Sequence, residues 1–495
     1  MRTIHFSRRS FAMKRALLAA LCLLILSLAA QSEEGSLPNL SRFRLSNGLE
    51  VFAYRDSALP LARVQISFRA GAMAQGPETA GLFRLYERML FHGEPALPGD
   101  SPLRSALAGL GLAGAEGGTT AESVAWWITV PSARTDEALA LWSSLCREPA
   151  FDSTELEARK AECLRAIAEG AKPDTIYEAA ITRRLFAKYP WRRDPAGSEK
   201  AINSASLDSL RTLQRTWFVP NNAALMVAGD IDPEAVRASA ERLFGAWKPG
   251  DDPWKKPLPP QPKPGVPRPT WIVYPDPSVP EGVASVEARY RGPDALADIP
   301  ATYGGDLWSA LVSSPEGKFK TAVMKTVPKL FGPESIQASY ATQRDGAWIS
   351  ISSFFYVDPA LPAVDRARLF KERVRGFEIT AMKTDPSYFS AKDYEDARRR
   401  LLVDRDLGLD TPDGVLDALA FWWSSSSVDY FLGYPAAMAK AGPKELGAFL
   451  DTYIMRNLEV VALRMNPADY EREKKSFAGS GFELVTPSNA FWWQK

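Results

Sequence analysis

The chain has 495 residues, of which 46% are hydrophobic and 24% charged, a composition typical of a globular protein and not of a disordered or fibrous one. Its formal net charge of +1 gives no overall attraction to polyanions, so binding to nucleic acid has no electrostatic support. The length is enough for roughly two to four ordinary domains with sizeable cores.

The N-terminus is predicted to be a targeting segment. Lys14 and Arg15 precede the apolar run ALLAALCLLILSLAA, which is short for a bilayer span and ends in small residues. We therefore predict a signal peptide over residues 1–32, export to the periplasm or the extracellular space, and no membrane span once the signal is removed. The segment SRRSF, residues 7–11, leaves a twin-arginine signal open beside an ordinary secretory one.

The next segments are predicted to alternate strands and helices. VFAYRDSALPLARVQISFRAG, from Val51, has the pattern of strands, and GLFRLYERML, residues 81–90, has helical spacing. On that helix Arg84, Glu87 and Arg88 share one face at i, i+3 and i+4, opposite an apolar stripe. Because three charged side chains lie on one face of this helix, we take the segment as the candidate site.

Two further elements follow in the first half. ESVAWWITVP, residues 122–131, alternates like a strand with one buried face. DSTELEARKAECLRAIAEG, residues 152–170, is predicted to be a helix that Asp152 caps, with Glu155 completing a capping box, and that Gly170 ends. Cys146 and Cys163 are the cysteines beyond the signal, and a disulfide and two buried thiols both remain open.

A proline-rich segment, residues 248–269, divides the chain almost in half, because so many prolines suit neither a helix nor a central strand. We predict domains over residues 36–247 and 270–495, joined by this linker. The halves resemble each other through residues that recur 220 positions apart, namely Tyr54 and Tyr274, Asp56 and Asp276, and Pro60 and Pro280.

The closing segments of the halves also correspond. NNAALMVAG, from Asn221, and RNLEVVALRMN, from Arg456, are each a polar turn followed by an apolar strand. We predict an α+β fold with two homologous domains, each a mostly antiparallel sheet covered by helices on one face.

ETAGLFRLYERMLFHGE resembles the inverted zinc-motif helix of the insulinase, pitrilysin and mitochondrial processing peptidases, in which H-x-x-E-H lies inside an apolar frame. The frame is present here as Gly81, Leu82, Met89, Leu90, Phe91 and Gly93. The resemblance continues through GGTTAESVAWWITVP, YPWRRDPAGSEKAI and WFVPNNAALMVAGDIDPEAVRASAERLFGAW, and it covers nearly all of the chain beyond the signal. It implies two domains that face each other across a chamber.

In that family the two motif histidines and a glutamate on a later helix hold zinc, while the motif glutamate activates water. The histidine positions are here Arg84 and Arg88, and the third ligand position, aligned through CLRAI, is Ala166. Only the general base position, Glu87, keeps its residue. Arginine is always protonated and offers donors only. The resemblance therefore implies a degenerate member without zinc or another cofactor, and we expect no peptidase activity.

Two departures from the family pattern bear on alternative sites. Glu87, His92 and Glu94 could form an alternative metal site, but the positive charges of two nearby guanidinium groups disfavour it. The second domain of the family often supplies an Arg and a Tyr near the substrate, and the nearest counterparts here are Lys325 and Glu334.

An ion-pair cluster is predicted in place of the metal. Glu162 and Glu169 lie at i−4 and i+3 from Ala166 and share its helix face. We expect Arg84 or Arg88 to reach one of these carboxylates, and Glu87 to pair along its own helix. The alternative is that both arginines point into water and bond nothing.

Three functions follow from this pattern. The first is an exported, non-catalytic partner or structural subunit of an active peptidase or envelope complex, paired with a homologous active subunit or with a second copy. The second is a free-standing peptide-binding or chaperone-like protein that accepts an extended peptide at a sheet edge. The third is an active zinc endopeptidase with a non-standard site.

Overall fold

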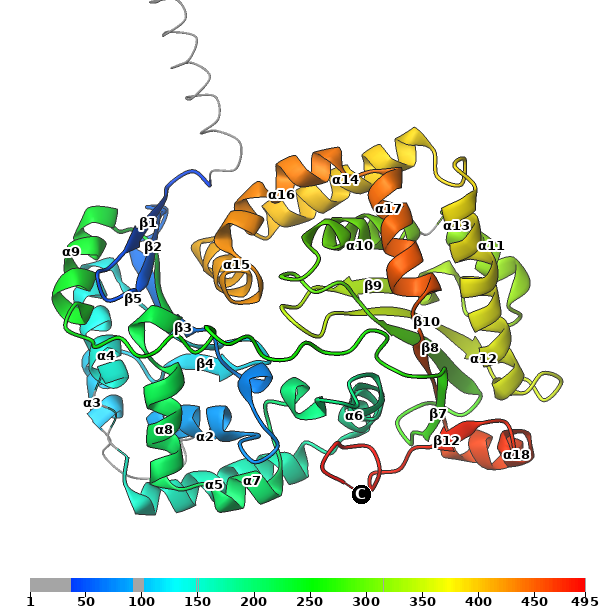
Figure 1. Ribbon diagram of the computed structural model, residues 1–495, viewed down its shortest axis with the longest axis horizontal. Helices are drawn as coiled ribbons and strands as arrows, with labels where there is room; N and C mark the ends of the chain where they lie inside the picture. Colours follow the sequence, from blue (N-terminus) through cyan, green and yellow to red (C-terminus); the bar gives the residue numbers. More distant parts are fainter. Residues whose placement is uncertain (1–36, 92–101, 148, 150, 315, 495) are drawn as a thin grey trace, which may run out of the picture.

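The computed structural model describes residues 37–494 apart from residues 92–101, 148, 150 and 315. The predicted signal peptide lies outside these residues, as do His92 and Glu94 of the alternative metal site. The described chain forms two α+β domains side by side, each built on a six-stranded sheet (Figure 1).

The N-terminal domain carries the sheet with strand order β1-β2-β6-β3-β5-β4. Its strands are β1 (Leu40–Arg44), β2 (Glu50–Arg55), β3 (Leu61–Phe68), β4 (Glu116–Thr119), β5 (Val124–Pro131) and β6 (Ala223–Gly229). Its α-helices are α2 (Leu82–Phe91), α3 (Pro102–Gly109), α4 (Thr135–Arg147), α5 (Ser153–Glu169), α6 (Pro173–Leu185), α7 (Glu199–Ser204), α8 (Leu207–Trp217) and α9 (Pro233–Phe244). The predicted strand at residues 122–131 and the predicted helices at residues 81–90 and 152–170 are confirmed as β5, α2 and α5.

The C-terminal domain carries the sheet with strand order β12-β7-β11-β8-β10-β9. Its strands are β7 (Thr270–Pro275), β8 (Val283–Arg291), β9 (Gln337–Ala341), β10 (Trp348–Tyr356), β11 (Glu459–Met465) and β12 (Phe482–Leu484). Its α-helices are α10 (Ile299–Val312), α11 (Lys318–Thr326), α12 (Ala363–Lys371), α13 (Thr380–Thr384), α14 (Ala391–Leu407), α15 (Pro412–Ser425), α16 (Val428–Lys440), α17 (Pro443–Phe449) and α18 (Pro467–Phe477). Two π-helical segments, Glu372–Ile379 and Leu450–Met455, continue α12 and α17.

The repeat predicted from the sequence is present in the sheets. Tyr54 of β2 pairs in parallel with Ala228 of β6, and Tyr274 of β7 pairs in parallel with Arg464 of β11. In both domains the closing strand, β6 or β11, then pairs antiparallel with the strand that precedes the first long helix. Both sheets are mixed, with antiparallel pairs in the majority.

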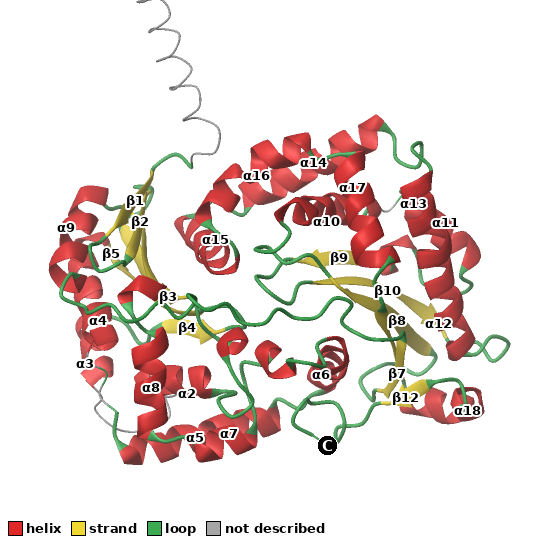
Figure 2. Cartoon of the chain, in the orientation of Figure 1, coloured by secondary structure: helices red, strands yellow, loops and turns green. Residues whose placement is uncertain are grey.

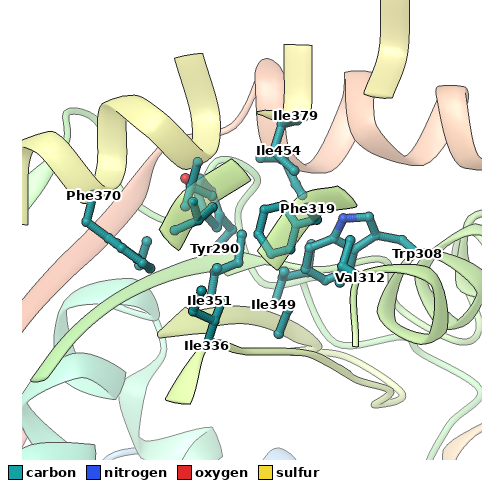
Figure 3. Packing of buried hydrophobic residues seen from close by; sticks show 14 of the residues in the cluster. Tyr290, Trp308, Val312, Phe319, Ile336, Ile349, Ile351, Phe370, Ile379 and Ile454 are labelled. Atoms are coloured by element: carbon teal, nitrogen blue, oxygen red, sulfur yellow. The ribbon is translucent and has the colours of Figure 1, made fainter. Parts of the chain in front are cut away.

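Each sheet has a main core on one face. In the N-terminal domain the inward side chains of β2, β3, β5 and β6 pack against α2, α4, α5, α8 and α9. The C-terminal core gathers Tyr290 of β8 and Ile349 and Ile351 of β10 against Trp308 of α10 and Phe319 of α11 (Figure 3). Burial of aliphatic and aromatic side chains on this scale is the main stabilising contribution to each domain.

The second face of each sheet is covered by a helix from the other domain. The sequence by itself predicts helices on one face only of each sheet. Helix α15 packs on the N-terminal sheet, where Trp423 meets Phe52 and Met226. Helix α6 packs on the C-terminal sheet, where Tyr177 meets Ile272. The physical reason is that β2, β6, β7 and β11 carry apolar side chains on both faces, so neither face can be left to water. Helices α6 and α15 therefore lie between the two sheets.

The proline-rich segment, residues 248–269, is a loop that runs from one domain to the other (Figure 2). Most of its side chains are exposed, and it is anchored at both ends. The Trp254 indole Nε1 donates to Arg69 O at 3.1 Å in the N-terminal domain. The Gln261 amide donates to the Asp345 carboxylate at 3.0 Å in the C-terminal domain, so the segment acts as a strap.

None of the helices in the described ranges combines the length and the hydropathy needed to cross a membrane. The two described cysteines, Cys146 and Cys163, are buried free thiols, so the disulfide alternative is wrong. They lie on α4 and α5, in the main core of the N-terminal domain.

Candidate functional site

The candidate site lies where α2 packs beside α5 at the lower edge of the N-terminal domain (Figure 1). Leu85, Tyr86 and Met89 are buried on the core side of α2, which turns the charged side toward α5 and the edge strand β4. Gly81 precedes the helix with φ 96°, in the left-handed region that favours glycine, and a Cβ there would lie 2.7 Å from Ala196 O. The helix entry is therefore fixed by close backbone contact.

Arg88 reaches Glu162, one of the two carboxylates expected to pair with it. Arg88 Nη1 lies 3.4 Å from Glu162 Oε2, and the two side chains are 24% and 14% exposed. Arg159, only 3% exposed, donates to the other oxygen of the same carboxylate. Glu162 is therefore shared between an arginine of its own helix and the arginine that stands at a histidine position of the resemblance.

Glu87 is held by a hydroxyl group. Thr119 Oγ1, at the end of β4, donates to Glu87 Oε2 at 2.6 Å. Burial raises the pKa of the Glu87 carboxyl, and the Thr119 hydrogen bond and the charges of Arg84 and Arg88 oppose that rise. The one residue that matches the family motif is thus engaged by a neighbouring side chain.

Arg84 is half-buried, and no hydrogen bond or ion pair joins its side chain to another residue in the described part of the chain. Its charge nevertheless lowers the pKa of two carboxyls, those of Glu87 and Asp194. Asp194 is a second, half-buried acid near the site, and desolvation raises its pKa. Arg84 therefore acts on the site through its charge alone, whereas Arg88 also forms an ion pair.

Glu169 does not join the cluster, contrary to expectation. Its side chain is exposed, and no ion pair connects it to another described residue. Glu169 lies seven residues after Glu162, which is about 10 Å along a helix axis at about 1.5 Å per residue. A side chain that far along α5 is beyond the arginine that Glu162 binds, while Ala166, between the two, offers no polar group.

The residues present do not fit a zinc ion. Arg84 and Arg88 offer donors only, and Ala166 has no lone pair to give. Cys163, on α5, is a soft ligand type, but burial raises the pKa of its thiol to about 11, which keeps it protonated. No group of three or more His, Cys, Asp or Glu side chains suited to a metal occurs among the residues that the structure describes.

The second-domain counterparts, Lys325 and Glu334, do not converge on this site. Lys325 is exposed on α11, which lies on the opposite side of the molecule from α2 (Figure 1). Glu334 is exposed in the turn before β9.

Three contributors to the site were missed from the sequence: Thr119, Arg159 and Asp194. Thr119 and Asp194 lie in segments that carry the resemblance, but nothing in their spacing shows that a hydroxyl would meet Glu87. Asp194 accepts from the amide of Ala196 at 3.0 Å and from Trp492 Nε1 at 2.9 Å. Trp492 comes from the end of the chain, a contact between residues 298 positions apart that no local pattern reveals.

A cleft of about 400 Å³ lies on the other face of the same sheet edge. It is bounded by Gly118 and Trp127 of the β4–β5 hairpin and by Asp417 and Phe421 of α15. Strand β4 is the last strand of its sheet and pairs only with β5 among the described strands. The cleft and the open edge are adjacent, which is an arrangement that suits an extended peptide.

Comparison with known families decides the classification. The family described as Insulinase (Peptidase family M16) matches residues 51–196, and the Peptidase M16 inactive domain matches residues 204–314. The chain belongs to the M16 peptidase family. The motif helix α2, the hairpin β4–β5 and α5 all lie within the first match.

Relatives in the M16 family carry different names. An uncharacterized zinc protease of Rickettsia bellii is 23% identical over 219 residues, which cover 43% of this chain and 52% of that protein. The non-peptidase homolog YmxG of Helicobacter pylori is 24% identical over 178 residues, covering 35% of this chain and 40% of that protein. The crystal structure of the first half of the periplasmic protease PqqL from Escherichia coli superposes with a TM-score of 0.70 at 14% identity, covering 90% of this chain and 96% of that one. This chain spans about half the length, or less, of the curated relatives it matches.

Proposed function

We propose that this M16 family member is a non-catalytic homologue, which serves as a partner or structural subunit of an active peptidase or of an envelope complex. One observation carries the proposal. The positions of the three metal ligands hold Arg84, Arg88 and Ala166, and Arg88 is bound to Glu162 at 3.4 Å. A general base such as Glu87 contributes only about 10²–10⁴-fold by itself, which is far below what peptide hydrolysis requires.

The retained structural features of the family support a partner role. The fold and the apolar frame of the motif helix are retained, while the ligands are replaced by side chains that pair with their surroundings. The chain matches the first half of PqqL over most of its length, which favours pairing with a second unit of the same kind. That unit is a homologous active subunit or a second copy of this chain.

Export to the periplasm or the extracellular space is part of the proposal. The predicted signal peptide over residues 1–32 supports it, and PqqL of Escherichia coli is described as periplasmic.

The test is an activity assay of the purified protein with zinc and a quenched fluorescent peptide, with Glu87→Gln as the matched control. We expect wild type and Glu87→Gln to show the same background rate. Hydrolysis by wild type that Glu87→Gln abolishes would show that the site is catalytic. Cross-linking and purification from the native envelope then identify the partner, and recovery of the chain alone as a monomer would contradict the subunit role.

A second candidate function, peptide binding without cleavage, is favoured by the open edge of β4. The Thr120 amide donates to Ser123 O at 2.8 Å across the turn to β5. Because hydrogen-bonded and free positions alternate in an antiparallel pair, the backbone groups of Gly117 and Thr119 face the open edge. An extended peptide could pair there and place alternate side chains in the adjacent cleft.

Amide hydrogen exchange separates this function from the first. An extended peptide bound at β4 should slow exchange at Gly117 and Thr119 and leave Gly118, which already faces β5, unchanged. Exchange rates at Gly117 and Thr119 that saturating peptide leaves unchanged would argue against binding at this edge.

A further inference from the structure

A separate cavity lies in the C-terminal domain, among α10, α14, α15 and α16, and no part of the proposed function uses it. Its volume is about 310 Å³. The side chains that bear on its chemistry are Asp306 of α10, Asp404 and Arg405 of α14, Trp422 of α15, and Phe431 and Tyr434 of α16. These helices form the upper part of the domain in Figure 1, away from α2 and β4.

Asp306 is a carboxylate without a cationic partner. Its Oδ2 accepts a hydrogen bond from Tyr434 Oη at 3.0 Å, and no lysine or arginine among the described residues forms an ion pair with it. Burial raises the pKa of this carboxyl to about 7, and only the Tyr434 hydrogen bond opposes the rise. Ionised at neutral to alkaline pH, Asp306 therefore places an uncompensated negative charge in the cavity.

Two fully buried carboxylates of the same domain, by contrast, have cationic partners. Glu459, with 0% exposure, lies 2.6 Å from both Lys371 and Arg375. Asp294, 3% exposed, lies 3.0 Å from Arg291. An unpaired buried charge is costly, and Asp306 differs from these groups in facing a cavity that could admit a cation from solution.

The walls of the cavity suit an organic cation. Trp422 and Tyr434 line it with aromatic surface, and a positive charge is attracted to the face of such rings. One wall already holds a cation in this way, because the Arg405 guanidinium lies 4.8 Å from the centre of the Phe431 ring. Arg405 does not neutralise Asp306, since its Nη1 pairs with Asp406 at 2.9 Å.

We propose that this cavity binds a small organic cation that bears N–H donors, an alkylammonium or guanidinium group, with its charged end on Asp306 and its body against Trp422 and Tyr434. The ligand should bear N–H donors because Asp306 Oδ1 accepts no hydrogen bond from another described residue and is available to accept one from a ligand. A volume of about 310 Å³ is at the lower limit of ligand pockets, so the occupant is a small amine or one basic side chain of a peptide.

The test is calorimetric titration of the purified protein at pH 8 with benzylamine, whose ring and ammonium group match the two parts of the cavity. Benzyl alcohol is the neutral control, and benzyltrimethylammonium is the cation without N–H donors. We expect benzylamine to bind at least about tenfold more tightly than either control. Titrations with agmatine and with Nα-acetyl-lysine amide then distinguish a free amine from a peptide side chain as the source of the cation.

Single-residue variants test whether benzylamine binds at Asp306. Asp306→Asn keeps the shape and removes the charge, so benzylamine affinity should fall at least about tenfold, while Asp404→Asn at the rim should change it less than about threefold. Tyr434→Phe keeps the ring and removes the hydrogen bond that stabilises the ionised Asp306, so its affinity for benzylamine should lie between those of wild type and Asp306→Asn. Benzylamine affinity should also fall when the pH drops from 8 to 5, because Asp306 becomes protonated.

Three results would overturn the proposal: equal affinity for benzylamine and benzyl alcohol, unchanged binding by Asp306→Asn, or an equal loss in Asp306→Asn and Tyr434→Phe. Thermal unfolding checks that each variant is folded. Asp306→Asn should be at least as stable as wild type at pH 8, because it removes a buried charge that has no partner.

Discussion

Arg88 Nη1 lies 3.4 Å from Glu162 Oε2, across the contact between the two helices that would carry the zinc ligands of an active M16 peptidase. Arg159 holds the other oxygen of the Glu162 carboxylate, so the acid has a cationic neighbour on each side. A fixed positive side chain thus stands at a position where the resemblance implies a metal ligand. We propose that this ion-pair cluster takes the place of a metal site, and the first three predictions test that proposal.

The Arg88–Glu162 pair should contribute measurably to stability, because both side chains are largely buried. In a double-mutant cycle with Arg88→Ala and Glu162→Gln, we expect a coupling of about 0.5–1.5 kcal/mol in the free energy of unfolding. Urea denaturation of the four proteins measures it. Arg211→Ala is the matched control, because Arg211 and Asp208 form an exposed pair, 51% and 91% exposed. Wild-type stability of Arg84→Ala/Arg88→Ala would contradict the cluster.

The purified protein is expected to hold no stoichiometric zinc, since arginine and alanine cannot coordinate it. Metal analysis after dialysis measures this, and about one zinc per chain would show that other ligands exist. Arg88→His alone should not restore binding, because Arg84 and Ala166 still contribute no ligand. The triple variant Arg84→His/Arg88→His/Ala166→Glu returns all three ligand types to α2 and α5, and it should bind about one zinc per chain.

Glu87 should make stability depend on pH. Burial raises the pKa of its carboxyl above the unfolded value, so the cost of ionising it is absent below the unfolded pKa of about 4.3. The cost grows as the pH rises toward the folded pKa and is complete above it. Glu87→Gln, which cannot ionise, should therefore gain stability relative to wild type between pH 4 and pH 8. Urea denaturation at both pH values is the measurement, and a difference that shrinks with rising pH would reverse the assigned shift.

Helix α15 should hold the two domains together. Trp423 is 1% exposed against the N-terminal sheet, and its Nε1 donates to Glu50 Oε1 at 3.0 Å. Trp423→Ala is expected to cost about 3–5 kcal/mol in the free energy of unfolding, as a large cavity in a core does. Phe421→Ala, on the same helix but 40% exposed, is the matched control and should cost under about 1 kcal/mol. Similar losses in both variants would mean that the interface does not depend on the buried face of α15.

The two free thiols should be unreactive in the native protein. Burial raises the pKa of Cys163 to about 11 and that of Cys146 further, which leaves little thiolate at pH 8. Titration with a thiol reagent should detect neither until denaturant is added, and Cys163→Ser should remove one equivalent from the denatured count. Rapid reaction of the folded protein would show that α4 or α5 opens readily.

Local patterns in the sequence determined the elements around the site. The spacing of Arg84, Glu87 and Arg88 requires only helical geometry, and α2 places them on one face as expected. Asp152 caps α5 by accepting from the Glu155 amide at 2.8 Å, and the helix ends before Gly170. The repeat of the two domains also followed from short segments, because β2 and β7 hold their positions in equivalent sheets.

The tertiary structure alone decided which partners meet. Arg88 pairs with Glu162 while Glu169 is exposed, because the packing of α2 on α5 brings only one turn of α5 within reach of Arg88. Thr119 reaches Glu87 only because an edge strand passes beside α2. Helices α6 and α15 each pack on the sheet of the other domain because the central strands are apolar on both faces. No local sequence pattern predicts which helix covers which sheet. Periodicity specifies the faces of an element, whereas contacts between distant residues depend on how whole elements pack, which short segments do not encode.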